Sequence, residues 1–580
     1  MKVTINSEDV TRSINQVSIR QKIAAHHSFE IRQSLEDRSS SFKDYLKTKS
    51  EELLGTKVEV KFDNNLFKGI ITSLSLGRSS IGGSDLIIHG TSPTAAMDEG
   101  ATTVSHYEKT LKEIVNTTIS NYNGSAVENK TKYSQKLKYI VQYQEGNFRF
   151  LTRLAGRFGE WLYYDGEKLY FGQKPAAGEI VDLNFGSDVQ SMDLNVRVVP
   201  VGFEVSAYDY KKHDFFSEKD KYSGLNEYAN IALNKSQNEV FAGKAKTALV
   251  QYYSKPDLKQ YVEVQSMARV SEMVFLSATS SKTSLRLGTF IHLQDQRMGL
   301  LGGADDYGKF IVTQITHSFV THGDRFDYSN HFEAIPEESA IPPLSSPINP
   351  PFCEIQLAEV MENNDPDSLG RIRVQFLWQR DDGEMSPWIR VASPYSGKDK
   401  GFYIIPEKGD QVLVAFESNN PERPYVLTGM YNSDAKPEHS DPDNLKKGLK
   451  TAGGIEILMN DEKGKETLGL TSPMDVAITA TGGKMDLTAK ATIVISSDGK
   501  SITIKTPDDI TIDGKNITIK GSAGIKLEAP KIENEAMASF KAKGAQTEIE
   551  GSATNTIKGA MVSISASAIA EVKGAMVKLN

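Results

Sequence analysis

The sequence predicts a mainly β protein with some helix. It divides into an α+β hub of barrel-like subdomains, a five-stranded barrel of the oligonucleotide/oligosaccharide-binding (OB) type, and a C-terminal β-helical rod. Three observations predict this class. Runs that alternate apolar and polar residues dominate the chain before residue 432, as half-buried strands do. Prolines gather between Pro336 and Pro351. Pairs of apolar residues recur every seven to nine residues from Val476 onward.

The composition excludes several classes of function. The 580 residues carry 24% charged side chains and a net charge of −8, so a nucleic-acid partner is not expected. The single cysteine, Cys353, excludes an intrachain disulfide framework and a thiolate metal cluster. The N-terminus lacks the pattern of a secretory signal, and no run approaches the ~18 apolar residues of a membrane span. We therefore expect synthesis in the cytoplasm without a signal peptide, and no stable membrane insertion.

Two polar, proline-containing stretches divide the chain. Six prolines make residues 336–351 an extended linker, because proline is excluded from helix interiors and central strands. Residues 433–451, rich in lysine and aspartate, form a second connector. The predicted parts are a hub-like domain over 1–335, an OB-type barrel over 352–432 and a β-helical needle over 452–580.

The hub is predicted as strand-rich with a few helices. Apolar residues at helical spacing indicate helices near 111–119 and over 147–158, the second capped by Asn147. Alternating patterns predict strands at 57–62, 67–76, 161–164 and 168–171, and Asp165-Gly166 is a hairpin signal between the last two.

The barrel is predicted from short alternating runs. Five short strands within about 80 residues suit a small closed barrel of the OB type. The clearest runs are 370–376, 388–391, 411–416 and 425–429.

The repeat begins with pairs such as Val476/Ile478 and Met485/Leu487. Each pair places two side chains on one face of a short strand, because successive side chains alternate faces. A chain that turns about every eight residues cannot close a core alone, so it coils as a solenoid or wraps with copies of itself. Phe540 is the only aromatic residue after Tyr431, which favours a thin rod over a globular domain. A monomeric β-solenoid remains open at this point.

Several segments resemble the VgrG spike proteins of contractile injection systems. The barrel resemblance lies in 369–378, 387–392, 405–416 and 420–429, with Leu377 and Gln379 where many relatives carry His and Asp. Segments 142–151 and 310–317 resemble the hub signature and its end. The resemblance implies a homotrimeric spike, equivalent to a fused phage tail hub and needle, in a type VI secretion system or an extracellular injection particle.

The same resemblance implies the partners. They are a hexameric inner-tube protein that the trimer caps, baseplate proteins, a cone-shaped PAAR-type tip protein, and effectors bound non-covalently. The spike would be assembled in the bacterial cytoplasm and exported on contraction. In an intertwined trimeric β-helix, the axis would be filled by Ile493, Ile495, Ile502, Ile504, Ile510, Ile512, Ile517, Ile519, Ile525 and Leu527. The expected tip-docking residues are Met576, Val577, Leu579 and Asn580.

No catalytic residue, metal site or cofactor is expected. His26-His27 is interpreted as a solvated pair, and Asp381, Asp382 and Glu384 as a solvated hairpin turn. Cys353 is interpreted as a small buried hydrophobe, and Trp378 and Trp388 as buried or trimer-facing aromatics rather than a stacking platform. Two alternative functions are kept, a trimeric adhesin or receptor-binding tail fibre and an enzyme-bearing spike. No separate head or enzyme domain is visible in the sequence to favour either.

Overall fold

The computed structural model describes residues 1–35, 42–78, 83–248, 252, 254–295, 305–322, 325–343 and 351–579. The chain forms two compact units, Met1–Thr471 and Ser472–Asn580. Part of the predicted linker, residues 344–350, lies outside the described residues, as does Asn580. No helix in the described ranges is long and apolar enough to cross a membrane.

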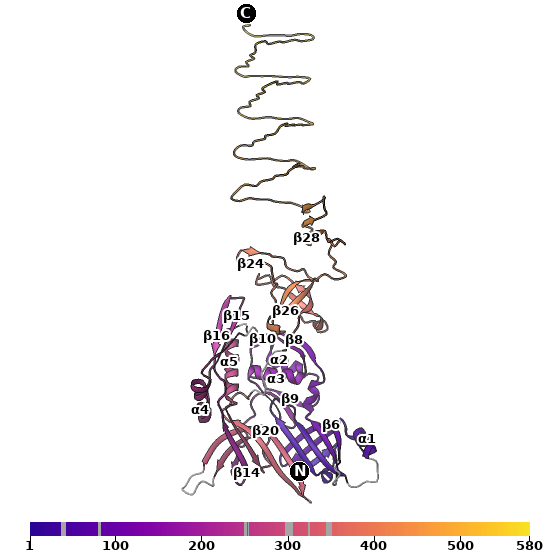
Figure 1. Ribbon diagram of the computed structural model, residues 1–580, viewed down its shortest axis with the longest axis vertical. Helices are drawn as coiled ribbons and strands as arrows, with labels where there is room; N and C mark the ends of the chain where they lie inside the picture. Colours follow the sequence, from indigo (N-terminus) through magenta and orange to yellow (C-terminus); the bar gives the residue numbers. More distant parts are fainter. Residues whose placement is uncertain are drawn as a thin grey trace. The chain divides into compact units, whose positions relative to one another are not determined.

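A curved sheet of thirteen strands organises the first unit (Figure 1). Its order is β14-β18-β21-β20-β3-β4-β7-β6-β5-β1-β2, with β13 joined through β19 to β20. Every pairing in this sheet is antiparallel except that of β13 with β19. Its strands are β1 (Lys2–Ile5), β2 (Glu8–Asp9), β3 (Gln16–Lys22), β4 (Ser28–Leu35), β5 (Lys57–Phe62), β6 (Asn65–Arg78), β7 (Ser84–Thr91), β13 (Val181–Asn184), β14 (Val189–Val196), β18 (Val274–Ser280), β19 (Phe290–Asp295), β20 (Asp305–His322) and β21 (Arg325–Pro336).

Smaller sheets and the helices complete the hub. The sheets contain β8 (Thr102–Thr110) with β10 (Lys136–Glu145), then β9 (Ala126–Asn129), β11 (Trp161–Tyr164) and β12 (Lys168–Gly172), then β15 (Phe203–Asp209), β16 (Asp214–Lys219) and β17 (Ala245–Ala248). The α-helices are α1 (Phe42–Leu53), α2 (Leu111–Thr118), α3 (Asn147–Phe158), α4 (Glu227–Lys235) and α5 (Lys255–Val270). Short 3-10 or π turns are η1 (Thr11–Ser13), η2 (Pro93–Asp98), η3 (Ser236–Val240), η4 (Leu377–Gln379) and η5 (Glu417–Asn419).

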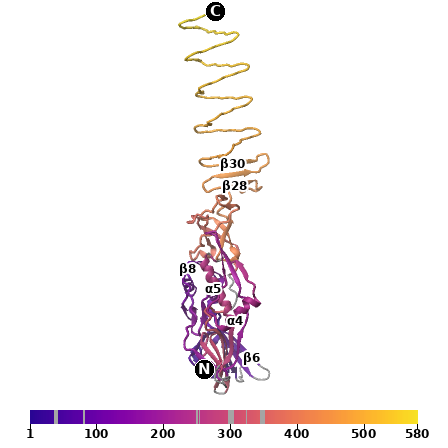
Figure 2. The same cartoon turned by 90° about the vertical axis from the view of Figure 1, so that its left-hand side faces the viewer.

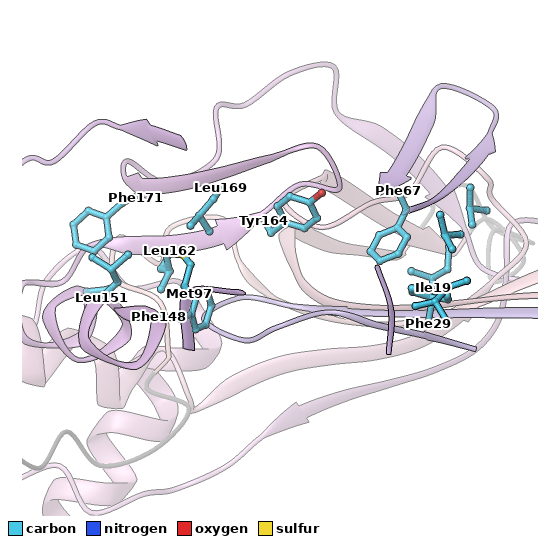
Figure 3. Packing of buried hydrophobic residues seen from close by; sticks show 14 of the residues in the cluster. Ile19, Phe29, Phe67, Met97, Phe148, Leu151, Leu162, Tyr164, Leu169 and Phe171 are labelled. Carbon is cyan, nitrogen blue, oxygen red and sulfur yellow. The ribbon is translucent and has the colours of Figure 1, made fainter. Parts of the chain in front are cut away.

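The core of the hub runs from the large sheet to helix α3 without a break. Figure 3 shows Ile19, Phe29 and Phe67 on the sheet side, and Leu151, Leu162 and Phe171 toward the helix, all in one buried cluster. Gly90 is required at a close approach in this core, since a Cβ there would lie 2.2 Å from both the Ile70 carbonyl oxygen and the Phe29 ring.

The N-terminus of α3 differs from the sequence prediction. Asn147 is the first residue of the helix rather than its cap, and Gly146 occupies the cap position. The Asp98 carboxylate accepts the backbone N–H of Phe148 at 3.0 Å and so replaces the missing side-chain cap from a distant turn. A cap supplied by tertiary contact leaves no local sequence signal.

The barrel contains fewer regular strands than predicted. One sheet has the order β23-β22-β26-β27, from β22 (Gln356–Glu362), β23 (Arg373–Phe376), β26 (Gln411–Phe416) and β27 (Pro424–Gly429). The predicted strand at 388–391 is wrong as a regular strand, because it pairs only through isolated bridges, Ile389 with Ile372 and Val391 with Val426. These bridges nevertheless connect the segment to two parts of the barrel. Strands β24 (Ser396–Gly397) and β25 (Lys400–Gly401) form a two-stranded hairpin. The antiparallel meander β28 (Lys446–Lys450), β29 (Glu456–Asn460) and β30 (Thr467–Thr471) completes the unit (Figure 2).

The second unit contains no helix or strand within its described part, 472–579. The chain instead winds back and forth in successive turns (Figures 1 and 2), with bends separated by about seven to nine residues. Each predicted apolar pair lies on an extended stretch between two bends; Ile510 and Ile512, for example, lie between the bends at 507–508 and 515.

Candidate functional site

The ten predicted axis residues all lie on extended stretches of the second unit. Their side chains are between 50% and 71% exposed, and none joins a buried cluster of the described residues. Isoleucine and leucine lose about 1.5–3 kcal/mol each when a buried side chain is instead left in water. Within one chain, therefore, the structure places these residues at equivalent positions between successive bends but does not bury them.

The backbone of the second unit is equally unpaired. Between residues 472 and 579, no backbone–backbone hydrogen bond joins one turn to another. A β-strand requires a hydrogen-bonded ladder with a neighbouring strand, so the strands expected in this unit are absent from the single chain between residues 472 and 579. Extended chain with open backbone edges and a one-sided apolar face is the form that pairs with further strands.

The predicted tip-docking residues are also exposed. Met576 is 76% and Leu579 is 91% exposed, while Val577 is about half exposed. The fourth predicted residue, Asn580, lies outside the described part of the chain.

A buried charge cluster joins the hub to the barrel. Glu422, only 3% exposed, accepts a hydrogen bond from Arg157 Nη1 at 2.7 Å and lies 3.6 Å from Arg153 Nη1. Arg153 and Arg157 are on helix α3, and Arg153 also binds Glu145 at 2.5 Å. Buried charges are retained only when they are paired and hydrogen-bonded, so this cluster fixes the helix against the barrel loop. We call these four residues the joint cluster.

A second polar contact connects the hairpin β15–β16 to the barrel. Arg371, 1% exposed, binds Asp365 at 2.5 Å and Asp367 at 2.7 Å, and donates to the Tyr210 hydroxyl at 3.4 Å. Lys211, at the hairpin tip, binds Asp367 at 2.5 Å. The hydrogen bonds from Arg371 hold the pKa of the Asp365 carboxyl well below its usual range.

The sequence analysis did not identify the joint cluster. Its one usable signal is the pair Arg153 and Arg157, four residues apart in a helix that otherwise buries Phe150, Leu151 and Leu154. Charged side chains among buried apolar positions of a helix indicate partners from another element. Sequence spacing alone could not have identified Glu422 as that partner.

The histidines that the structure describes do not gather into a metal site. Among the described residues, no three His, Cys, Asp or Glu side chains come together to hold a metal ion. His26 contacts Asp98 at 3.1 Å, whereas His27 is fully buried and contacts Gln21 at 3.3 Å. The interpretation of a solvated pair is therefore wrong for His27, because its ring packs against Tyr164 in the core.

The other candidate residues lie on an exposed turn or pack against neighbouring side chains. Asp381 and Asp382 are exposed on a turn with Gly383 at φ 64°. Burial raises the pKa of the Cys353 thiol to about 11, the opposite of an activated nucleophile. Trp378 stacks on Phe376 with ring centroids 5.3 Å apart and donates to Gln356 at 2.9 Å.

Matches to family models show which protein family the chain belongs to. The model of the phage tail baseplate hub (GPD) matches residues 29–323, more than half of the chain. The chain belongs to the phage tail baseplate hub (GPD) family. The type VI secretion system/phage-baseplate injector OB domain matches residues 356–431, as expected for an OB-type barrel.

The curated relatives of this hub protein are VgrG proteins, so the predicted resemblance is confirmed. The type VI secretion system spike protein VgrG1c of Pseudomonas aeruginosa is 24% identical over 57% of this chain and 49% of its own length. The actin cross-linking toxin VgrG1 of Vibrio cholerae is 28% identical over 26% of this chain and 15% of its own length. The chain spans about half or less of the length of the curated relatives it matches.

A solved structure confirms the fold class. A chain in the lidless PdpA–VgrG complex has a TM-score of 0.51 at 10% identity, covering 81% of this chain and 98% of that chain. The match supports the mainly β architecture with a hub and an OB-type barrel.

Proposed function

We propose that this protein is the homotrimeric central spike of a contractile injection apparatus, which caps the inner tube and punctures a target membrane. The observation that carries the proposal is the second unit, where regularly spaced bends present exposed apolar pairs and an unpaired backbone. Copies wound together would bury the pairs on one axis and pair the open strand edges between chains. Family membership favours three copies, and contraction elsewhere in the particle would supply the energy for penetration.

The mass of the assembly tests this function. Light scattering of the purified chain is expected to give three times its mass of 63.9 kDa. A stable monomer that keeps its native strand content by circular dichroism would exclude the intertwined spike.

Each predicted domain has its own proposed role. Residues 1–335 would form the tube-binding hub, 352–432 the OB-type barrel, and 452–580 the needle, with 336–351 and 433–451 as connections. The joint cluster and the Arg371 contacts would keep hub and barrel in a fixed relation under axial load. We place assembly in the bacterial cytoplasm, with export on contraction.

The proposed partners include the inner tube, the baseplate, a PAAR-type tip protein and non-covalently bound effectors. Exposed Met576, Val577 and Leu579 support tip docking, because uncovered apolar side chains with open strand edges mark an interaction surface. Deleting residues 571–580 is expected to leave the trimer intact and abolish capture of the tip protein in a pull-down. Unchanged capture by the truncated trimer would place the docking surface elsewhere.

We also propose that this chain acts mechanically rather than as an enzyme. The buried Cys353 and the exposed turn at Asp381–Asp382 support this. The name of the Vibrio cholerae relative describes that protein, of which the match covers 15%. The purified trimer is expected to leave peptidoglycan, lipid, nucleic acid and actin unmodified. Turnover that follows the trimer through successive purification steps would contradict the proposal.

A further inference from the structure

Two fully buried histidines of the hub are connected through one glutamine. His27 lies in the connection between β3 and β4, and His317 lies on β20. Gln21, on β3, is 4% exposed and contacts both rings. Its amide nitrogen is 3.3 Å from His27 Nδ1, and its amide oxygen is 3.2 Å from His317 Nε2. The two rings therefore share a single amide group.

The hydrogen-bond roles on the His27 side follow one from another. His27 Nε2 is 3.2 Å from the carbonyl oxygen of Lys22, which can only accept, so this nitrogen carries a hydrogen. Burial lowers the pKa of His27 to about 3, so the ring is neutral at pH 7 and its Nδ1 accepts from the Gln21 amide nitrogen. The amide oxygen of Gln21 is then left to accept from His317 Nε2.

The chain of hydrogen bonds continues beyond His317. Burial lowers the pKa of this ring to about 3 as well, so its Nδ1 accepts from the Tyr328 hydroxyl at 2.9 Å. The Tyr328 oxygen in turn accepts from Asn330 Nδ2 at 3.1 Å. We call Gln21, His27, His317, Tyr328 and Asn330 the core network. Its hydrogen bonds all run in one direction, from Asn330 toward His27, and both rings are neutral with their hydrogen on Nε2.

Aromatic rings cover the two histidines. The ring centroid of Phe62 is 4.8 Å from that of His317. Phe67 and Tyr164, both visible in Figure 3, lie 6.4 Å and 5.4 Å from the His27 ring. An added positive charge would therefore be placed in poorly solvated surroundings.

A polar cavity of about 30 Å³ borders the core network. Gln21 and His317 line it, and its volume is large enough for a water molecule. A proton from solvent thus has a polar site beside the network. The titratable and charged groups that face the two rings or this cavity are His26, Tyr164, Asp165, Glu167, Arg286 and Tyr328.

We propose that Gln21 makes the core network an acid-sensitive lock between β3, β20 and β21. A proton on Nδ1 of His27 would face the amide N–H of Gln21, and a proton on Nδ1 of His317 would face the hydroxyl hydrogen of Tyr328. Turning the Gln21 amide over would suit a charged His27, but it would present N–H groups to Nε2–H of His317. One amide oxygen cannot accept from two charged rings, so the network cannot stay intact when both are protonated. The inference rests on the hub sheet and is independent of the proposed spike function.

The protonation of the two rings in the full-length protein tests the proposal. Solid-state NMR of protein labelled with ¹⁵N-histidine shows which ring nitrogens carry a hydrogen, and His27→Gln and His317→Gln assign the two rings among the ten histidines. At pH 7 and at pH 5, both rings are expected to be neutral with hydrogen on Nε2. A charged ring at pH 5, or hydrogen on Nδ1 of either ring at pH 7, would overturn the proposal.

Gln21→Glu tests the role of the shared amide. The introduced carboxylate accepts on both sides, so His27 can hold a second hydrogen that faces it. A charged His27 is expected at pH 5 in this variant and not in the wild type. Gln190→Glu makes the same change on the exposed side of β14, and it should leave both rings neutral at pH 5. A neutral His27 in Gln21→Glu at pH 5 would show that the amide does not control the ring.

Hydrogen exchange followed by mass spectrometry measures whether the lock holds the sheet. In the wild type, the protection of peptides covering 16–22 and 314–320, corrected for the intrinsic exchange rate, is expected to fall as the pH falls from 6 to 4.5. The expected fall is about tenfold per pH unit for each histidine that gains a proton on opening. Gln21→Glu should reduce it by about tenfold per pH unit, because His27 is already charged in the closed sheet. Identical pH profiles for Gln21→Glu and Gln190→Glu would overturn the lock.

Discussion

At the residue scale, the joint cluster shows how a few charges fix one element on another. Glu422 faces two arginines of α3, and all three side chains are nearly buried. Removing one partner of such a cluster leaves the opposite charge without compensation in a poorly solvated site. The loss in the free energy of unfolding then depends on the arginines that remain buried, and not on the lost hydrogen bond alone.

Glu422→Gln is expected to lower the free energy of unfolding by about 3–5 kcal/mol, because Arg153 and Arg157 then face a neutral amide. Urea denaturation followed by tyrosine and tryptophan fluorescence measures the change. Asp382→Asn, on an exposed turn, is the matched control and should stay within about 0.5 kcal/mol of the wild type. Equal effects of the two substitutions would show that the joint cluster contributes no stability.

Two buried histidines make stability depend on pH. Burial lowers the pKa of His27 and of His317 to about 3, against about 6.5 in an unfolded chain. Below pH 6.5 the unfolded chain therefore binds protons that the folded chain does not. Stability is present in full above pH 6.5 and is lost as the pH falls toward 3, by about 1.4 kcal/mol per pH unit for each histidine.

His317→Gln is expected to reduce this slope by about 1.4 kcal/mol per pH unit between pH 6 and pH 4.5, since one titrating group is removed. Urea midpoints at four pH values within that interval measure the slope. His331→Gln changes an exposed histidine and should leave it as in the wild type. A His317→Gln slope identical to the wild-type slope would mean that the buried ring does not control acid stability.

At the element scale, the sequence predicted what depends on local pattern and missed what depends on distant partners. Helix α2 begins with Leu111, where apolar spacing placed it, and its Thr110 cap is local. Alternation predicted β5 and the hairpin of β11 and β12. The cap of α3 comes instead from Asp98, and the segment 388–391 pairs with two different strands through single bridges. Neither arrangement has a periodic signature.

Asp98→Ala is expected to destabilise the hub by about 0.5–2 kcal/mol, because the first backbone N–H groups of α3 lose their acceptor. Thermal unfolding monitored by circular dichroism measures the loss. Glu51→Ala, on the exposed surface of α1, is the control and should change stability little. An unchanged melting temperature for Asp98→Ala would show that water replaces the cap at no cost.

At the scale of the whole molecule, the two units obtain stability in different ways. The first unit closes its buried clusters within one chain; one contains Val3 of the large sheet and another contains Phe376 of the barrel. The second unit leaves its apolar pairs in water and its backbone edges open, so we expect other chains to cover them, as in the proposed trimer. The periodicity of the sequence predicted the bends and the pairs, whereas the predicted strands are absent from residues 472–579 of the single chain, where no neighbouring strand pairs with them.

Two substitutions at adjacent residues test whether the apolar pairs of the second unit are buried between chains. In a trimer, Ile512→Asp would bring three carboxylates together near one dry axis, and burial of unpaired charges is strongly unfavourable. Thr511→Asp, one residue earlier, would place the same charge on the opposite face of the extended stretch. Light scattering is expected to show loss or dissociation of the trimer for Ile512→Asp and an intact trimer for Thr511→Asp. If both variants assemble equally well, Ile512 does not face a common axis, and the apolar pairs must be covered in some other way.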